Sequence, residues 1–142
     1  SLNEAYEDIL IVNIDDDDIP ELYILGKYHM AGAVLCWIDN GEVKFKPCGQ
    51  NFGYSEKSGK CYAYTMQMGV SLLTEYTLTN GNLTEKKIAS CSENDNSYTW
   101  NEETVSQKEF WDKYKAYVNK YTTPDTSEYI KREAFDTVIK SY

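Results

Sequence analysis

Hydrophobic and polar positions alternate with the two-residue period of β-strands over the first two thirds of this chain. Apolar, β-branched runs at Ile9–Val12 and Leu22–Leu25 flank an acidic segment, which is typical of two strands joined by a loop. The same reading predicts a strand at 61–66, polar loops at 49–59 and 92–97, and an extended piece at 98–100.

Two Asn-Gly pairs predict tight β-hairpins, because both central positions of a type I′ turn need positive φ. A turn centred on Asn40-Gly41 organises residues 33–48 and makes one face of that hairpin apolar throughout. The expected pairs on that face are Ile38 with Val43, Cys36 with Phe45, and Val34 with Pro47. The opposite face carries Trp37 with Lys44 and Leu35 with Lys46.

The second pair, Asn80-Gly81, predicts a longer hairpin. Its expected pairs are Leu78 with Leu83, Thr77 with Thr84, Glu75 with Lys86, and Leu73 with Ile88. Facing threonines and facing opposite charges are combinations that stabilise adjacent antiparallel strands.

The apolar period becomes helical in the last third of the chain. Ser106 and Glu109 form an S-x-x-E capping box, and we expect a helix over about 106–121. A second helix is expected over about 126–141, with an apolar stripe made of Ile130, Phe135, Val138, Ile139 and Tyr142. The fold class is therefore α+β: an antiparallel sheet of about six or seven strands over residues 8–100, followed by two C-terminal helices. We expect residues 1–142 to form a single domain.

The net charge of −9 excludes several classes of partner. Nucleic-acid binding and docking on anionic lipid both need clustered Lys and Arg, so neither is expected. No apolar run approaches the roughly 20 residues of a membrane span. The chain begins at Ser1 rather than Met, and we expect a processed form or a fragment.

The four cysteines form no C-x-x-C pair, which argues against zinc and thioredoxin-type sites. Two disulfides and four buried thiols are both compatible with the even count. The cysteines are Cys36, Cys48, Cys61 and Cys91.

The acidic loop is the candidate metal site. Five carboxylates and an asparagine occupy nine consecutive positions from Asn13 to Glu21. Calcium takes six to eight oxygen ligands, and alternate side chains of a wrapped loop can supply them. The candidate ligands are Asn13, Asp15, Asp17, the Ile19 carbonyl and Glu21. A solvated acidic turn without metal, and a site for another cation, are the alternatives.

The stretch from Ile14 to Leu22 resembles the D-x-D-G-D-G-x-P-E-L calcium loop of secreted bacterial proteins, which is similar to the loops of FG-GAP-type repeats. Asp16 and Asp18 stand where that pattern has glycine. It is not an EF-hand, because Ile24 stands where the bidentate Glu is needed. The whole chain is similar to secreted or lipoprotein-type domains of Gram-positive anaerobes, which end in a V-S-x-x-E-F helix like residues 105–110. The resemblance implies an extracellular or envelope-anchored protein with structural calcium.

Catalytic groups are not evident from the sequence, and no catalytic residue is predicted. His29 is the only histidine, and there is no H-E-x-x-H, P-loop or G-x-G-x-x-G.

Three functional hypotheses remain. The first is a non-enzymatic extracytoplasmic domain that binds a protein or glycan and uses calcium to hold its acidic loop. The second is a carbohydrate-binding module, for which exposed rings would stack on sugars. The candidate stacking residues are Trp37, Trp100, Tyr62, Tyr64 and Tyr76. The third is a hydrolase that uses the acidic residues.

Overall fold

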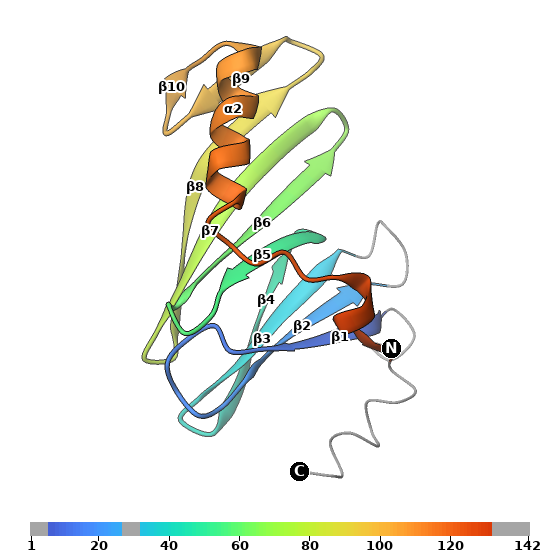
Figure 1. The fold of residues 1–142 in the computed structure, drawn as a ribbon, viewed down its shortest axis with the longest axis vertical. Coiled ribbons are helices and arrows are strands. Elements are labelled where there is room, and N and C mark those ends of the chain that lie inside the picture. The colour runs from blue at the N-terminus through green and yellow to red at the C-terminus, as the bar shows by residue number, and fades with distance from the viewer. Residues whose placement is uncertain (1–5, 27–31, 132–142) are drawn as a thin grey trace.

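The structure, a computed structural model, describes residues 6–26 and 32–131, which form two antiparallel sheets and one α-helix (Figure 1). The first sheet has five strands in the spatial order β11-β1-β2-β3-β4. Their bounds are β1 (Tyr6–Val12), β2 (Glu21–Gly26), β3 (Ala33–Asp39), β4 (Glu42–Cys48) and β11 (Ile130–Lys131).

The second sheet has six strands in the order β10-β9-β8-β7-β6-β5. Their bounds are β5 (Asn51–Ser55), β6 (Lys60–Gln67), β7 (Val70–Thr79), β8 (Asn82–Ser92), β9 (Ser97–Trp100) and β10 (Glu103–Thr104). The expectation of one sheet with six or seven strands was wrong. The chain changes sheets between β4 and β5, which are neighbours in sequence but do not pair.

Strand β5 was missed because residues 49–59 look polar in sequence. It is a short strand whose only large apolar side chains are Phe52 and Tyr54. Pairing with β6 and burial of Phe52 at 4% exposure hold it in place. Tertiary contacts therefore override a weak local strand preference.

Both predicted Asn-Gly turns are confirmed, with φ of 52° and 77° at Asn40 and Gly41, and 51° and 80° at Asn80 and Gly81. The pairs expected around them form as predicted, except one at the far end of the second hairpin. There a β-bulge shifts the register, and Leu73 faces Ala89 instead of Ile88.

The first predicted helix is confirmed as α2 (Gln107–Val118), and it ends three residues before the expected bound. The Ser106 side chain caps it by accepting a hydrogen bond of 3.1 Å from the Glu109 backbone N–H. No helix among residues 6–26 and 32–131 is long and apolar enough to cross a membrane.

The second predicted helix, over 126–141, does not form in its described part. Residues Thr126–Glu128 make a single 3₁₀ turn, and β11 follows by pairing with β1. Residues 132–142 lie outside the described part of the chain. The described residues thus contain one C-terminal α-helix rather than two.

The elements form three layers, with the second sheet in the middle. Its β6 and β7 send Cys61, Ala63, Tyr76 and Leu78 into a core shared with the first sheet. Side chains that alternate with these form a second core with Phe110 of α2. Figure 1 shows the first sheet in the lower half of the view and α2 beside the upper part of the second sheet.

Candidate metal centre at the loop end

The acidic loop connects β1 to β2, and its own carboxylates hold the backbone in a wound conformation. Asp15 Oδ1 accepts a hydrogen bond of 3.3 Å from the Asp17 backbone N–H. Asp17 Oδ1 accepts one of 2.9 Å from the Ile19 backbone N–H. These Asx-type turns explain why aspartates at alternate positions fold this segment back on itself.

Three of the predicted ligands converge. Asp15, Asp17 and Glu21 each offer one carboxylate oxygen, and these oxygens lie within 4.8 Å of one another. Such a group can hold a metal ion. The other two predicted ligands, Asn13 and the Ile19 carbonyl, stay predictions, because this distance relates only the three carboxylates.

Glu21 is the buried member of the group, at 2% exposure. Its Oε2 accepts a hydrogen bond of 2.7 Å from the Ile14 backbone N–H. Burial and the nearby charges of Asp15 and Asp17 raise the pKa of Glu21 to about 7, although the Ile14 N–H opposes this shift. Burial, followed by interactions with Asp17, also raises the pKa of Asp15. A cation beside these groups would favour their ionised forms.

The acidic loop is tied to the second sheet through the β5–β6 turn. The Lys57 N–H donates to the Asn13 carbonyl at 2.9 Å, and the Gly59 N–H donates to the Ile14 carbonyl at 2.6 Å. Ile14 itself is fully buried in the core between the sheets. The position of the carboxylates therefore depends on both sheets.

A cavity of about 630 Å³ lies beside the carboxylates, where four connections meet. Asp15, Asp16 and Asp17 line it together with the β5–β6 turn and both Asn-Gly turns. The four connections gather on the left of Figure 1, and we call this part of the molecule the loop end. The sequence predicted the acidic loop and both Asn-Gly turns, and it placed the β5–β6 turn inside a longer polar loop over 49–59. It gave no signal that the four connections meet, because their meeting depends on how the two sheets pack.

The five predicted stacking residues do not form an exposed row. Their exposure lies between 4% and 9%, and all belong to the two cores. Trp37, for example, points between the sheets, where its Nε1–H donates to the Gly81 carbonyl at 2.8 Å. Sugar stacking on these rings would require the cores to open, so the alternative of a carbohydrate-binding surface on them loses its basis.

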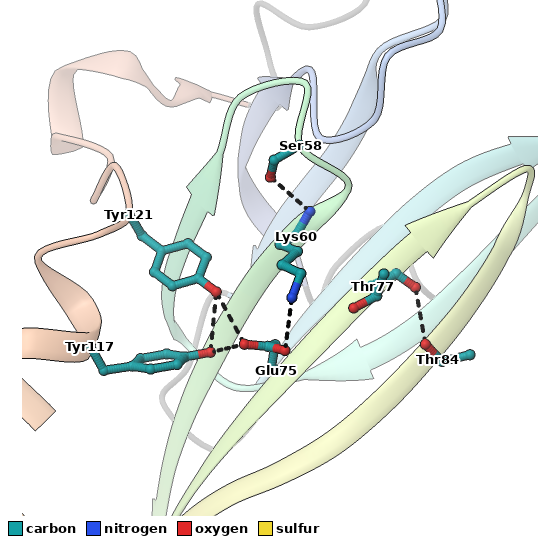
Figure 2. A network of polar contacts seen from close by, with 7 residues as sticks. All are labelled: Ser58, Lys60, Glu75, Thr77, Thr84, Tyr117 and Tyr121. Carbon is teal, nitrogen blue, oxygen red and sulfur yellow. Dashed lines mark hydrogen bonds and ion pairs between the residues drawn. The ribbon is translucent and has the colours of Figure 1, made fainter. Parts of the chain in front are cut away.

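A second polar cluster, which sequence reasoning missed, surrounds Glu75 on β7 (Figure 2). Glu75 Oε2 accepts hydrogen bonds from the Tyr117 hydroxyl at 2.7 Å and the Tyr121 hydroxyl at 3.3 Å. Lys60 Nζ lies 3.5 Å from the other carboxylate oxygen. The cluster joins the end of α2 to the middle sheet. The positions of these residues in the sequence give no indication that they meet.

The remaining candidates add no reactive group to the loop end. His29 lies outside the described residues. All four cysteines are free thiols, and Cys61 and Cys91 are buried. Burial raises the pKa of the Cys48 thiol to about 12, which disfavours the reactive thiolate.

Comparison of this chain with protein-family models, curated proteins and solved structures finds no match. The site must therefore be interpreted from its own geometry.

Proposed function

We propose that this chain is a non-enzymatic extracytoplasmic domain whose β1–β2 loop binds calcium and presents the loop end to a protein or glycan partner. The observation that supports the proposal most directly is the convergence of Asp15, Asp17 and Glu21 within 4.8 Å. Like charges held this close in a partly buried site repel each other, and a divalent cation would offset that repulsion.

Calcium fits the ligand set better than other biological cations. The ligands are oxygens, which hard cations prefer, and no cysteine or histidine among the described residues joins the three-carboxylate group. Calcium also tolerates irregular coordination, whereas magnesium requires a near-octahedral shell. The resemblance of residues 14–22 to calcium loops of secreted proteins supports the same choice.

The bound ion would act on the shape of the whole loop end. The segment that carries the carboxylates also provides the Asn13 and Ile14 carbonyls that bind the β5–β6 turn. An ion that fixes this loop would therefore also fix one wall of the cavity of about 630 Å³. Extracellular modules typically bind calcium at 10⁻⁴ to 10⁻³ M, a range suited to the calcium levels outside cells.

The first prediction concerns thermal unfolding in EDTA and in excess calcium. Calcium that binds only the folded loop stabilises it by about 2.7 kcal/mol at one hundred times the dissociation constant. For a chain of this size, we expect the melting temperature to rise by about 5–10 °C. Calorimetry or circular dichroism measures the shift. The Asp15→Asn/Asp17→Asn variant should lose the response and should melt higher than the parent in EDTA, because its carboxylates no longer repel.

The matched control is Asp16→Asn/Asp18→Asn. It removes the same charge from the same loop but leaves the three-carboxylate group intact, and both residues are exposed. This variant should keep the calcium response. An equal loss in both variants would show that the calcium-dependent rise in melting temperature depends only on the net charge of the loop. The proposed site would then be abandoned.

A further inference from the structure

A cavity of about 370 Å³ is lined by residues of α2 and of the middle sheet, and lysines gather around it. Lys113 lies on α2, Lys120 lies in the turn that ends this helix, and Lys86 lies on β8. Two apolar side chains, Ile88 and Trp100, form part of the wall. The chain has 14 basic residues against 23 acidic ones, so this lysine cavity locally reverses the net charge of −9.

The winding of α2 directs two of these lysines to the same side. Lys113 and Lys120 are seven positions apart, which is about two turns of a helix. Helical winding continues past the last residue of α2, because the Lys120 backbone N–H donates to the Tyr117 carbonyl at 3.2 Å. Lys108 and Lys115 are rotated from Lys113 by about 140–160° around the helix axis, so they project away from the cavity.

The alternation of side chains along β8 places the third lysine on the same side. Lys86 pairs with Glu75 of β7, the residue that contacts the end of α2 (Figure 2). The preceding residue, Glu85, points to the opposite face and forms an ion pair of 3.3 Å with Lys46 of the first sheet. Lys87, on the other side of Lys86, also belongs to that opposite face.

The three lysines that line the cavity have exposed side chains that the protein does not neutralise. In residues 6–26 and 32–131, no carboxylate forms an ion pair with any of them. The lysines that do form ion pairs there are Lys44, Lys46, Lys60 and Lys108. Like charges around one cavity repel each other, and a bound anion would offset that repulsion.

Glu75 also lines the cavity, but its carboxylate is already occupied. One oxygen lies 3.5 Å from Lys60 Nζ, and the other accepts hydrogen bonds from the hydroxyls of Tyr117 and Tyr121 (Figure 2). The charge of Lys60 offsets that of Glu75. The positive charge of the other three lysines therefore remains available to a ligand.

Asn101 adds a neutral donor to the same cavity. Its backbone has φ of 49°, and its N–H donates to the Ile88 carbonyl at 2.8 Å. This hydrogen bond holds the turn after β9 against β8. The side-chain amide of Asn101 can donate two N–H groups to an oxyanion beside the ammonium groups.

We propose that the lysine cavity binds a dianionic phosphate group, either free phosphate or a phosphate monoester. Hydrogen bonds from ammonium groups to phosphate oxygens are charge-assisted and strong. A phosphate monoester carries a charge of about −1.5 to −2 at pH 7, which matches three lysines better than a single carboxylate does. Ile88 and Trp100 offer an apolar wall to the organic part of an ester. The inference does not depend on calcium binding, because the cavity lies beside α2 and not at the loop end.

The test is calorimetric titration of the full chain with inorganic phosphate and with phenyl phosphate, at low ionic strength and in EDTA. The variant that removes the site is Lys113→Gln/Lys120→Gln. Its matched control is Lys108→Gln/Lys115→Gln, which removes the same charge from the other side of the same helix. Lys86→Gln and Lys87→Gln form a second pair on β8. All these side chains are exposed, and circular dichroism checks that each variant keeps the fold.

We expect the parent to bind at least one of the two phosphates. Lys113→Gln/Lys120→Gln and Lys86→Gln should each raise the dissociation constant about tenfold or more, the effect of losing a hydrogen bond to a charged group. The two control variants should change it by less than about twofold, because exposed charges at a distance are screened. Tighter binding of phenyl phosphate would identify an ester as the ligand, and equal binding would identify free phosphate.

Two results would overturn the proposal. One is the absence of binding by the parent when each phosphate is in large excess over the protein. The other is equal weakening by the site variants and their controls, which would mean that the anion responds only to the net charge of the chain.

Discussion

At the scale of single residues, Glu75 shows how a partly buried charge is held in this molecule. Its side chain is 16% exposed and contacts two hydroxyl donors and one ammonium group. Burial alone would raise the pKa of Glu75. The hydrogen bonds from Tyr117 and Tyr121 and the charge of Lys60 outweigh burial and lower the pKa below its usual 4.5.

Replacement of this carboxylate should therefore have a pH-dependent effect. We expect Glu75→Gln to lower the free energy of unfolding by about 1.5–3 kcal/mol at pH 7, the range for hydrogen bonds to charged groups. A lowered pKa stabilises the folded state above pH 4.5, and that stabilisation disappears as the pH falls through the folded-state pKa. The difference between parent and variant in urea unfolding should thus shrink below pH 4.5.

Glu85→Gln is the matched control, because Glu85 is 53% exposed and forms a surface ion pair with Lys46. It should cost about 0.5 kcal/mol or less. An undiminished difference between Glu75→Gln and the parent at pH 3 would contradict the role assigned to the Glu75 charge.

At the scale of elements, the two Asn-Gly turns have the same backbone but different surroundings. Gly41 and Gly81 have φ of 77° and 80°. A Cβ at Gly41 would meet nothing within 4 Å. A Cβ at Gly81 would collide with the Asp39 side chain, which belongs to the first sheet. The close approach of this turn to the first sheet also lets the Gly81 carbonyl accept a hydrogen bond from the Trp37 indole.

This difference predicts unequal effects of the same substitution. Gly41→Ala should lower the free energy of unfolding by about 1–2 kcal/mol, the cost of a left-handed backbone with a side chain. Gly81→Ala should cost about 1–3 kcal/mol more, because the added methyl group must also displace Asp39. Urea unfolding of the two variants measures both values. Equal losses would mean that Asp39 moves aside freely and that the contact between the turns is loose.

At the scale of the whole molecule, three layers share the middle sheet, and each outer layer depends on a separate core. Phe110 anchors the helical layer, because it is fully buried and contacts the rings of Tyr98 and Trp100. The acidic loop belongs to the other interface, through Ile14. A substitution at the interface between α2 and the middle sheet should therefore leave calcium binding at the acidic loop unchanged.

We expect Phe110→Ala to lower the free energy of unfolding by about 3–5 kcal/mol, since it leaves a cavity in the second core. Trp111→Ala, the neighbouring ring at 37% exposure, should cost clearly less, about 1–2 kcal/mol. Denaturant unfolding measures both. If folded Phe110→Ala lost the calcium response of the parent, the independence of the two interfaces would be disproved.

Features that depend on near neighbours along the chain could be predicted from the amino-acid sequence. The Asn-Gly turns fixed hairpin register because only certain residues accept positive φ. The Ser106 and Glu109 pair located the start of α2 because capping is local. The spacing of Asp15, Asp17 and Glu21 indicated a carboxylate group because the loop folds back through its own Asx turns.

How these elements combine depends on long-range packing, which the three-dimensional structure reveals. This packing divided the strands into two sheets and recruited Asn51–Ser55 as a strand, because pairing with β6 outweighs the weak preference of that segment. It buried the face of the first hairpin that carries Leu35 and Trp37 and left the all-apolar face outside, because the second sheet covers only one side. It also brought Glu75 to Tyr117, which lies 42 positions away. Alternation along a strand states which residues share a face, but what covers that face depends on distant parts of the chain.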